Sequence, residues 1–436
     1  MTTPIALPVA SPSRRWWILA FISIALFGNY YVYDSIAPVA DLLQQGLGFS
    51  DTQIGMLNAI YSLPNIAMVL IGGMLVDRFG AALVTLWTAA LCLAGALLTA
   101  VGSPFAVMAT GRLLFGLGAE TMIVATLVAL GHWFAGHRVA LAMAISVSVA
   151  RAGSYAADLS PSLAKSLYDQ GWQAPLVLAA GFAAVAAAAV VAYWWLDARG
   201  AVRAAAPPPA AERFVWADLW RFDRSYWYLL AVCVLYYSAI FPFRSTFAIK
   251  YFQHAQGLTL EAAGLMNSYV FLAAIFATPA FGWLTDRIGR RALLMALGSC
   301  LLAASFVLLS ATTGHLGVAT TLIGISFSLV PAVLWPAVSL LVEPHRLGTA
   351  YGLMTLLQNV GLAICNVFAG WLNDLYNAGA THPAGYQPML WFFGSLGVLS
   401  CGFGVGLWRR ERGPQGHGLE VVTRPTVPGD GASPGG

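Results

Sequence analysis

Two residues of opposite charge stand inside apolar stretches that are long enough to cross a membrane. Glu120 interrupts the stretch 104–131, and Arg151 interrupts the stretch 138–164. An α-helix rises about 1.5 Å per residue, so both residues are expected near the middle of their helices and at the same depth. A charge at that depth is costly unless it is paired or faces water, and it usually marks a functional site. Two interpretations follow: a salt bridge between the helices, or a pocket with one anionic and one cationic wall.

The pocket interpretation predicts a small zwitterionic ligand. Its ammonium group would bind Glu120, and its carboxylate would bind Arg151, because a planar guanidinium can donate two parallel hydrogen bonds to a carboxylate. The two interpretations are compatible, since an empty pocket can close the pair on itself until a ligand separates the two side chains. Further polar and aromatic contacts to the ligand are assigned to Tyr61, Tyr237, Trp335, Gln358 and Asn359.

The composition indicates an all-α membrane protein. Hydrophobic residues make up 59% of the 436 residues and charged residues only 9%, against about 25% charged in soluble domains. A cleaved signal peptide is a competing interpretation of the first apolar run, but the run is long and no small-residue cleavage site ends it. Runs of this length predict membrane-spanning helices. Twelve are expected, at 16–41, 52–76, 81–101, 104–131, 138–164, 174–196, 225–250, 260–284, 290–311, 315–341, 346–374 and 387–408.

The basic residues predict the orientation of these helices. Most of the 22 Lys and Arg residues fall on one side if both termini are cytoplasmic, as the positive-inside rule requires. The net charge of +4 therefore reports topology and does not indicate a nucleic-acid partner. The sequence shows no nucleophile–base arrangement, no phosphate-binding loop and no metal-ligand spacing. We expect no enzymatic activity, no cofactor and no metal.

The longest polar break divides the chain into two halves of six helices. We expect a cytoplasmic linker at 197–224 between the halves 16–196 and 225–408, with a cytoplasmic tail at 1–15 and a disordered tail at 409–436. Two six-helix halves with a binding cavity between them are the architecture of a secondary transporter.

The two halves also share a sequence repeat. "GGMLVDRFG" and "FGWLTDRIGRR" align Asp77 with Asp286 at an offset of 286 − 77 = 209 residues. The same offset aligns Gly73 with Gly282, Gly80 with Gly289, Arg78 with Arg287, and Asn58 with Asn267. The pattern G-x-x-x-D-R-x-G resembles the signature of the major facilitator superfamily. We expect Asp77, Arg78, Asp286 and Arg287 to hold the cytoplasmic face shut in one conformation, through arginine pairs or helix capping, the alternative being turns that only fix topology.

Four more charged residues are predicted to form a layer about 9–10 Å towards the outer face. They are Asp34, Arg112, Asp158 and Arg244. Asp34 and Arg244 are expected to pair across the outer mouth, the alternative being that water satisfies each separately. Arg112 belongs to an R-x-x-x-G-x-G pattern that resembles the fourth-helix motif of the superfamily, which is linked to proton transfer. A structural arginine that caps the main chain of the first helix is an equal alternative for Arg112.

Longer segments resemble the lysosomal dipeptide uniporter branch of this superfamily. They include "FGNYYVYDS", "GRLLFGLGAET", "HWFAGHRVALAMAISVSVARAGS" and "LWPAVSLLVEPHRLGTAYGLMTLLQNVGLAI". The resemblance implies transport of dipeptides through a cavity between the halves. It maps the acidic and basic site residues of the family onto Glu120 and Arg151, and motifs of its C-terminal half onto Trp335, Gln358 and Asn359.

The sequence departs from the animal members of that branch in ways that affect localisation. The N-terminal "MTTPIALPVASPSRRWW" has no acidic dileucine sorting signal, and the Ala- and Arg-rich composition is typical of a bacterial protein. We therefore expect a monomer in a bacterial inner membrane, and the sequence leaves open whether an accessory subunit is needed.

Two alternative functions remain. One is proton-coupled transport of organic anions or carboxylate chelators, with Arg112, Arg151 and Arg244 as an anion path and Glu120 as the proton site. The other is a membrane sensor or scaffold, for which the linker and tails offer no signalling domain.

Overall fold

The computed structural model describes residues 12–135, 138–200, 221–311 and 315–421. The described chain is helical apart from turns and one isolated bridge between Gly379 and His382. The expected all-α fold is therefore confirmed.

Each half is built from six long helices and short connecting ones. The N-terminal half contains α1 (Pro12–Asp34), α2 (Ile36–Leu47), α3 (Asp51–Phe79), α4 (Ala81–Val101), α5 (Phe105–Trp133), α6 (Val139–Leu163), α7 (Lys165–Tyr168) and α8 (Gln173–Gly200). The C-terminal half contains α9 (Arg224–Pro242), the π-helical turn η2 (Phe243–Phe247), α10 (Ala248–Gln256), α11 (Leu260–Ile288), α12 (Arg291–Ala311), α13 (Leu316–Leu341), the 3₁₀ turn η3 (Pro344–Arg346), α14 (Leu347–Leu375), the 3₁₀ turn η4 (Pro383–Tyr386) and α15 (Gln387–Glu411).

The number of spans depends on how polar and bent helices are treated. Ten described helices, four of them formed by neighbouring segments, are long and apolar enough to cross a membrane. Counting α3, whose two arms meet at 58°, as one span gives eleven. The remaining expected span, at 138–164, corresponds to α6, in which Arg151, Asp158 and several serines lower the hydropathy. It has 25 residues and packs between α1 and α11.

The first expected span is longer than predicted and is interrupted. The stretch 16–41 becomes α1 and α2, which part at Ser35. The Ser35 hydroxyl donates a hydrogen bond to the Val32 carbonyl at 2.8 Å, so the break occurs where a side chain competes for a main-chain acceptor.

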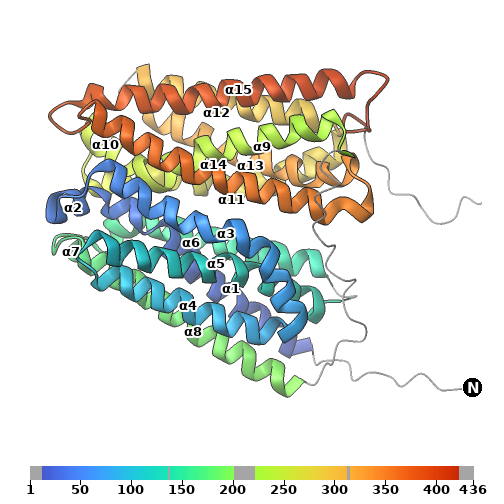
Figure 1. Ribbon diagram of the computed structural model, residues 1–436, viewed down its shortest axis with the longest axis horizontal. Helices are drawn as coiled ribbons and strands as arrows, with labels where there is room; N and C mark the ends of the chain where they lie inside the picture. Colours follow the sequence, from blue (N-terminus) through green and yellow to red (C-terminus); the bar gives the residue numbers. More distant parts are fainter. Residues whose placement is uncertain (1–11, 136–137, 201–220, 312–314, 422–436) are drawn as a thin grey trace, which may run out of the picture.

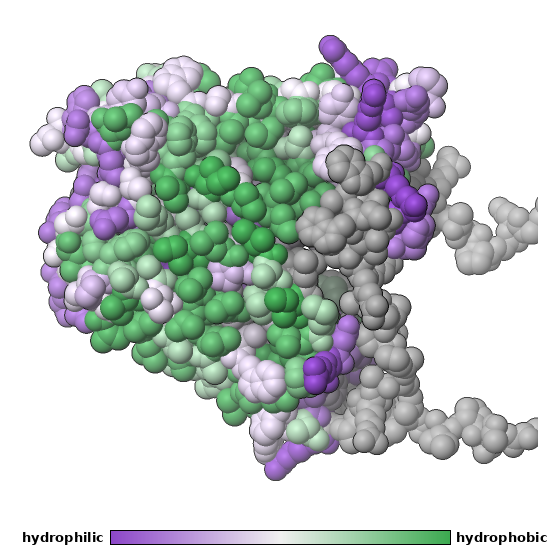
Figure 2. All heavy atoms as spheres, viewed as in Figure 1, coloured by the Kyte–Doolittle hydropathy of each residue, from purple (hydrophilic) through white to green (hydrophobic). Residues whose placement is uncertain are grey.

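The two halves lie side by side (Figure 1). Across their boundary α3 packs against α14, and α6 packs against α11. The halves approach each other at the end that carries α2, α7 and α10, and they diverge towards the end where α1 begins and α15 ends (Figure 1). We call these the α2–α10 end and the terminal end. Figure 2 shows a broad apolar band across the visible face, with hydrophilic residues gathered towards both ends, as expected for a membrane protein.

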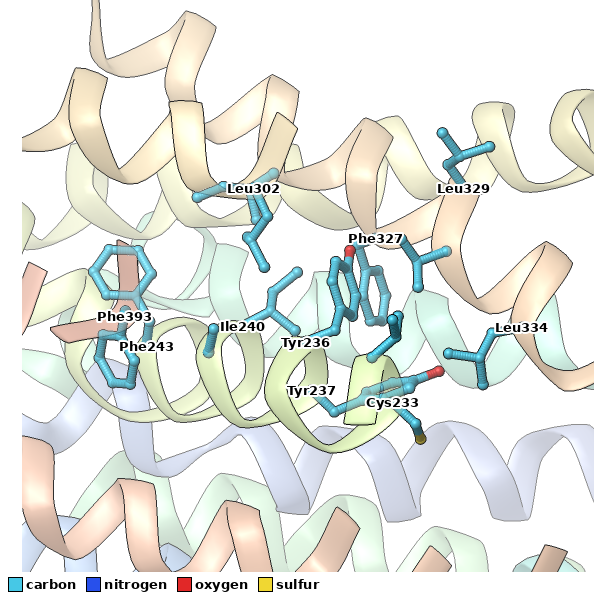
Figure 3. Close-up of a cluster of buried hydrophobic side chains, with 14 of the residues drawn as sticks. Cys233, Tyr236, Tyr237, Ile240, Phe243, Leu302, Phe327, Leu329, Leu334 and Phe393 are labelled. Atoms are coloured by element: carbon cyan, nitrogen blue, oxygen red, sulfur yellow. The ribbon is translucent and has the colours of Figure 1, made fainter. Parts of the chain in front are cut away.

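The interior of the C-terminal half is packed around α9. Tyr236 and Ile240 lie on the side of α9 that faces Leu302 and Phe327 (Figure 3), and Phe243, the first residue of η2, belongs to the same core cluster. Tyr237 lies on another side of the same helix (Figure 3). In a bilayer, where lipid tails are as apolar as this core, such packing stabilises the fold chiefly through van der Waals contact and hydrogen bonds.

The beginning of the C-terminal tail is folded, contrary to the expectation of disorder from residue 409. The Leu419 side chain is fully buried, and its carbonyl accepts a hydrogen bond from the Arg291 amide at 2.8 Å. The Glu420 carboxylate accepts hydrogen bonds from the amides of Ala292 at 3.1 Å and Leu293 at 3.2 Å. Glu420 therefore caps the N-terminus of α12, whose first amides have no partner within the helix.

Parts of the other expected segments lie outside the described residues. These parts are residues 1–11 of the N-terminal tail, 201–220 of the linker and 422–436 of the C-terminal tail.

Candidate functional site

Glu120 of α5 and Arg151 of α6 do not pair with each other. Both side chains are partly exposed, although they lie in the middle of long helices. Glu120 accepts a hydrogen bond from the Tyr61 hydroxyl at 3.3 Å, and no ion pair joins Glu120 to Arg151 among the described residues. The salt-bridge interpretation is therefore not realised in this conformation.

Arg151 lies among aromatic rings from both halves. Its guanidinium carbon is 5.5 Å from the ring centre of Tyr30 in α1, 5.8 Å from that of Phe271 in α11 and 4.8 Å from that of Phe327 in α13. Aromatic faces attract a cation without using its N–H groups as conventional donors. The arrangement leaves those donors suitable for a carboxylate.

Tyr237 and Trp335 form the part of the site that the C-terminal half contributes. The Trp335 indole N–H donates to the Tyr237 hydroxyl at 3.0 Å, and the Tyr351 hydroxyl donates to the Trp335 carbonyl at 3.1 Å. Tyr237 is close enough to Arg151 to interact with its charge. Of the residues proposed from the sequence, the structure joins Trp335 to Tyr237 by a hydrogen bond.

Gln358 and Asn359 are separated by the geometry of α14. Successive helical residues point about 100° apart, so the two amides have different neighbours. Gln358 is partly exposed and accepts a weak hydrogen bond from the Cys233 thiol at 3.7 Å. Asn359 is buried and accepts from the Asn65 amide of α3 at 3.3 Å. Asn359 is thus a contact between the halves, whereas Gln358 remains partly accessible.

The α2–α10 end contains the expected Asp34–Arg244 pair with a third member. Arg244 donates to Asp34 at 2.6 Å and to Asp158 at 2.8 Å. All three side chains are at most 3% exposed. Sequence analysis gives the depth of Asp158 but not its partner. One arginine from the C-terminal half therefore binds carboxylates from two helices of the N-terminal half.

Arg244 belongs to η2, and another residue of this turn, Thr246, contacts side chains from both halves. The Thr246 hydroxyl donates to Asn366 of α14 at 2.7 Å. Thr246 also accepts from the Asn58 amide of α3 at 2.7 Å. π-Helical turns are rare and are concentrated at functional sites. The turn thus links α3 to α14 at the same level as the charged cluster.

Arg112 has the environment of a structural arginine. It is 1% exposed and donates to the main-chain carbonyls of Val32 at 3.2 Å and Tyr33 at 3.3 Å. Its third acceptor is the Asn58 side chain at 2.5 Å. No carboxylate of the described chain lies within ion-pair distance of Arg112. This geometry favours the capping interpretation over proton transfer.

Further polar contacts join the halves at the α2–α10 end and were not expected from the sequence. Asp374 of α14 accepts from the Asp51 amide at 2.8 Å and from the Thr52 amide at 2.8 Å. Two ion pairs of the described chain also cross the boundary, Lys250 with Asp51 and Lys165 with Glu261 at 2.6 Å, and a His254 ring nitrogen lies at hydrogen-bond distance, 2.9 Å, from the Asp41 carboxylate. Most of these residues stand near helix ends, where charges are common, and Asp41 lies within α2, so the sequence offers no signal for their partners.

The terminal end lacks the expected contacts between the repeated turns. Asp77, Arg78, Asp286 and Arg287 are all exposed. Gly80 and Gly289 adopt φ of 84° and 65°, so the tight glycine turns themselves are present. Within the described chain, none of the four charged residues forms an ion pair across the halves or a helix cap. These contacts are absent from this conformation, in which the halves diverge at this end (Figure 1).

Within the described residues there is no cluster of His, Cys, Asp and Glu suited to a metal ion.

These features define a membrane transporter: two six-helix halves, a charged site at mid-depth and one closed end. The Major Facilitator Superfamily model matches residues 22–248 and 243–428, so the chain belongs to this family. It is a transporter and not an enzyme.

Relatives within the family include the lysosomal dipeptide transporter MFSD1. The Danio rerio protein is 30% identical over 387 residues, which are 84% of this chain and 83% of that protein. The Homo sapiens protein is 30% identical over 393 residues, 85% of this chain and 83% of that protein. A probable sulfoacetate transporter, SauU of Cupriavidus necator, is 24% identical over 381 residues, 82% of this chain and 87% of that protein.

Among solved structures, the nucleoside transporter NupG has a similar fold. It matches with a TM-score of 0.73 at 12% identity, covering 90% of this chain and 99% of that chain. At this identity the match supports the major facilitator fold alone.

Proposed function

We propose that the protein transports dipeptides, or similar small zwitterions, by alternating access. Glu120 binds the ammonium group of the substrate and Arg151 binds its carboxylate. The observation that carries the proposal is that these two opposite charges are partly exposed inside the bundle and do not neutralise each other. The relatives named as dipeptide transporters support it.

The energetic argument concerns charges that lack a partner. A charge within the membrane is costly, and a ligand with one positive and one negative end offsets both charges of the site at once. A peptide with blocked termini offers neither charge, so it leaves Glu120 and Arg151 uncompensated. Tyr61, Tyr237, Trp335 and Gln358 supply the surrounding contacts, and Asn359 contributes through the Asn65 contact between the halves.

The structure corresponds to one state of the transport cycle. We assign the α2–α10 end to the outer face, since most Lys and Arg residues lie towards the other end. Asp34, Arg244 and the main-chain contacts of Arg112 then form a closed outer gate. In the opposite state Asp77, Arg78, Asp286 and Arg287 approach each other as the cytoplasmic end closes. This orientation places both termini in the cytoplasm, and we assign the protein to a bacterial inner membrane as a monomer.

The direct test is ligand binding by purified protein, measured as thermal stabilisation. Dipeptides with free termini are expected to stabilise the wild type, and their N-acetylated, C-amidated forms are not. Glu120→Gln and Arg151→Gln are each expected to weaken dipeptide binding at least about tenfold, the value of one charge-assisted hydrogen bond. Glu343→Gln and Arg409→Gln, at exposed positions, are matched controls. Equal stabilisation by blocked peptides contradicts the proposal.

A second candidate is transport of organic anions, which the sulfoacetate relative favours. Of the three arginines expected to form an anion path, Arg112 is sealed against main-chain carbonyls and Arg244 already binds two carboxylates. Only Arg151 of these three remains available for an anion in this conformation. Stabilisation by sulfoacetate that survives Glu120→Gln, together with no response to dipeptides, favours this candidate.

A further inference from the structure

Tyr30 of α1 carries a hydroxyl group that none of the described residues binds, in the neighbourhood of both site charges. Its side chain is partly exposed, and its ring lies 5.5 Å from the Arg151 guanidinium carbon. Its phenol is close enough to Glu120 and Arg151 to interact with the charge of each. Tyr30 thus lies within reach of the region around both site charges.

The neighbouring tyrosines use their hydroxyl groups differently. Tyr61 donates to Glu120 at 3.3 Å, Tyr236 shares a hydrogen bond with Ser326 at 2.8 Å, and Tyr237 accepts from Trp335 at 3.0 Å. The Tyr30 hydroxyl has no such partner within the described chain, and its side chain is partly exposed, so the hydroxyl is free to bind a ligand.

We propose that the Tyr30 hydroxyl donates a hydrogen bond to the peptide carbonyl of a bound dipeptide, which makes the site selective for a carbonyl between two charged ends. The inference rests on the proposed function, in which Glu120 and Arg151 bind the two termini.

The order of groups in a dipeptide fits this contact. The peptide carbonyl belongs to the residue that carries the ammonium group, so it lies on the Glu120 side of the amide. The Glu120 carboxylate attracts the phenol hydrogen, and the Arg151 guanidinium attracts the phenol oxygen. Both charges therefore favour a hydroxyl whose hydrogen points towards Glu120. A ligand without the carbonyl leaves the hydroxyl unpaired in a desolvated site, which weakens binding.

Three zwitterions of equal backbone length test the Tyr30 contact independently of the binding of their two charged ends. Glycylglycine has the whole amide, 5-aminolevulinate keeps the carbonyl but has no N–H, and 5-aminopentanoate has neither. Their dissociation constants can be measured by calorimetry on the purified full chain. In the wild type we expect glycylglycine and 5-aminolevulinate to bind about three- to tenfold more tightly than 5-aminopentanoate.

The variant Tyr30→Phe removes only the hydroxyl. All three ligands are then expected to bind with the weaker affinity of 5-aminopentanoate, whose own binding stays unchanged and so reports a folded site. Tyr228 lies near the start of α9, and Tyr228→Phe is the matched control. It is expected to keep the wild-type ratios of the three dissociation constants.

The outcomes distinguish this inference from the proposed function. If Tyr30→Phe keeps the wild-type preference for the carbonyl ligands, the role of Tyr30 is wrong and the zwitterion site stands. If the wild type binds the three ligands equally, the role of Tyr30 is also wrong. If the wild type binds none of them, the proposed function fails and this inference fails with it.

Discussion

Asn58 of α3 and Asn267 of α11 hold the same turn, η2, through hydrogen bonds to its main chain. Asn58 donates to the Ser245 carbonyl at 3.0 Å, and Asn267 donates to the Arg244 carbonyl at 3.2 Å. The two asparagines are equivalent in the sequence repeat, yet both act on one element of the C-terminal half. A π-helical turn exposes carbonyls that buried structure must satisfy. The repeat thus supplies one amide from each half to the turn that carries Arg244.

The first prediction concerns these two amides. Asn58→Leu and Asn267→Leu each leave a buried carbonyl without a partner, which costs about 1–3 kcal/mol and shifts the protein away from the closed α2–α10 end. The measurement is labelling by a membrane-impermeant maleimide of a cysteine placed at buried Ala248, in a background without the native cysteines. Labelling is expected to rise at least about fivefold in both variants. Gln173→Leu, an exposed amide, is the control, and a rise there of equal size contradicts the argument.

The second prediction follows from the two carboxylates on Arg244. Arg244→Gln leaves two buried acids without a cation, whereas Asp34→Asn leaves Arg244 bound to Asp158. Removing one member of a buried ion pair costs about 3–5 kcal/mol. Arg244→Gln is therefore expected to open the α2–α10 end more than Asp34→Asn, by the same cysteine assay.

The charge-reversal experiment distinguishes a pair from this three-membered cluster. The double variant Asp34→Arg with Arg244→Asp places the new aspartate beside Asp158, so it is expected not to restore closure. A full rescue by that double reversal shows that Asp158 does not contribute.

The sequence predicts the helices and the depth of their charges well, because both follow from the position of a residue along the chain. Apolar runs and the 1.5 Å rise place Asp34, Asp158 and Arg244 in one layer, and in the structure Arg244 binds both carboxylates. The repeated D-R turns identify the halves and the family. Depth alone, however, does not give the direction in which a side chain points around its helix.

That direction and the conformational state decide the contacts that the sequence leaves open. Gln358 and Asn359 are adjacent in sequence but have different neighbours, because α14 is packed against both α9 and α3. The four charges of the repeated turns do not pair because this conformation separates their ends. The glycine-rich composition of the tail predicts disorder. Its folded start depends on Leu419, a single apolar residue that is fully buried in the structure.

The third prediction concerns the cap that α14 provides for α3. The Asp374 carboxylate binds two amides at the N-terminus of α3, where a negative charge also interacts favourably with the helix dipole. Asp374→Ala is expected to lower the stability of the closed conformation by about 0.5–2 kcal/mol and so to increase labelling of the cysteine at position 248. The exposed Asp169→Asn is the control. Unchanged labelling in Asp374→Ala rules out a role for the cap in closure.

The fourth prediction concerns the docked start of the C-terminal tail. Because Leu419 is fully buried and Glu420 caps α12, Leu419→Ala is expected to lower the free energy of unfolding by about 2–5 kcal/mol. Glu420→Ala is expected to cost about 1 kcal/mol. Both effects can be measured as shifts of the thermal unfolding midpoint in detergent. Truncation after residue 421 removes none of these contacts and is expected to leave the midpoint unchanged, whereas truncation after Glu411 is expected to lower it as much as Leu419→Ala or more. Equal midpoints for the two truncations show that the docked segment does not stabilise the fold.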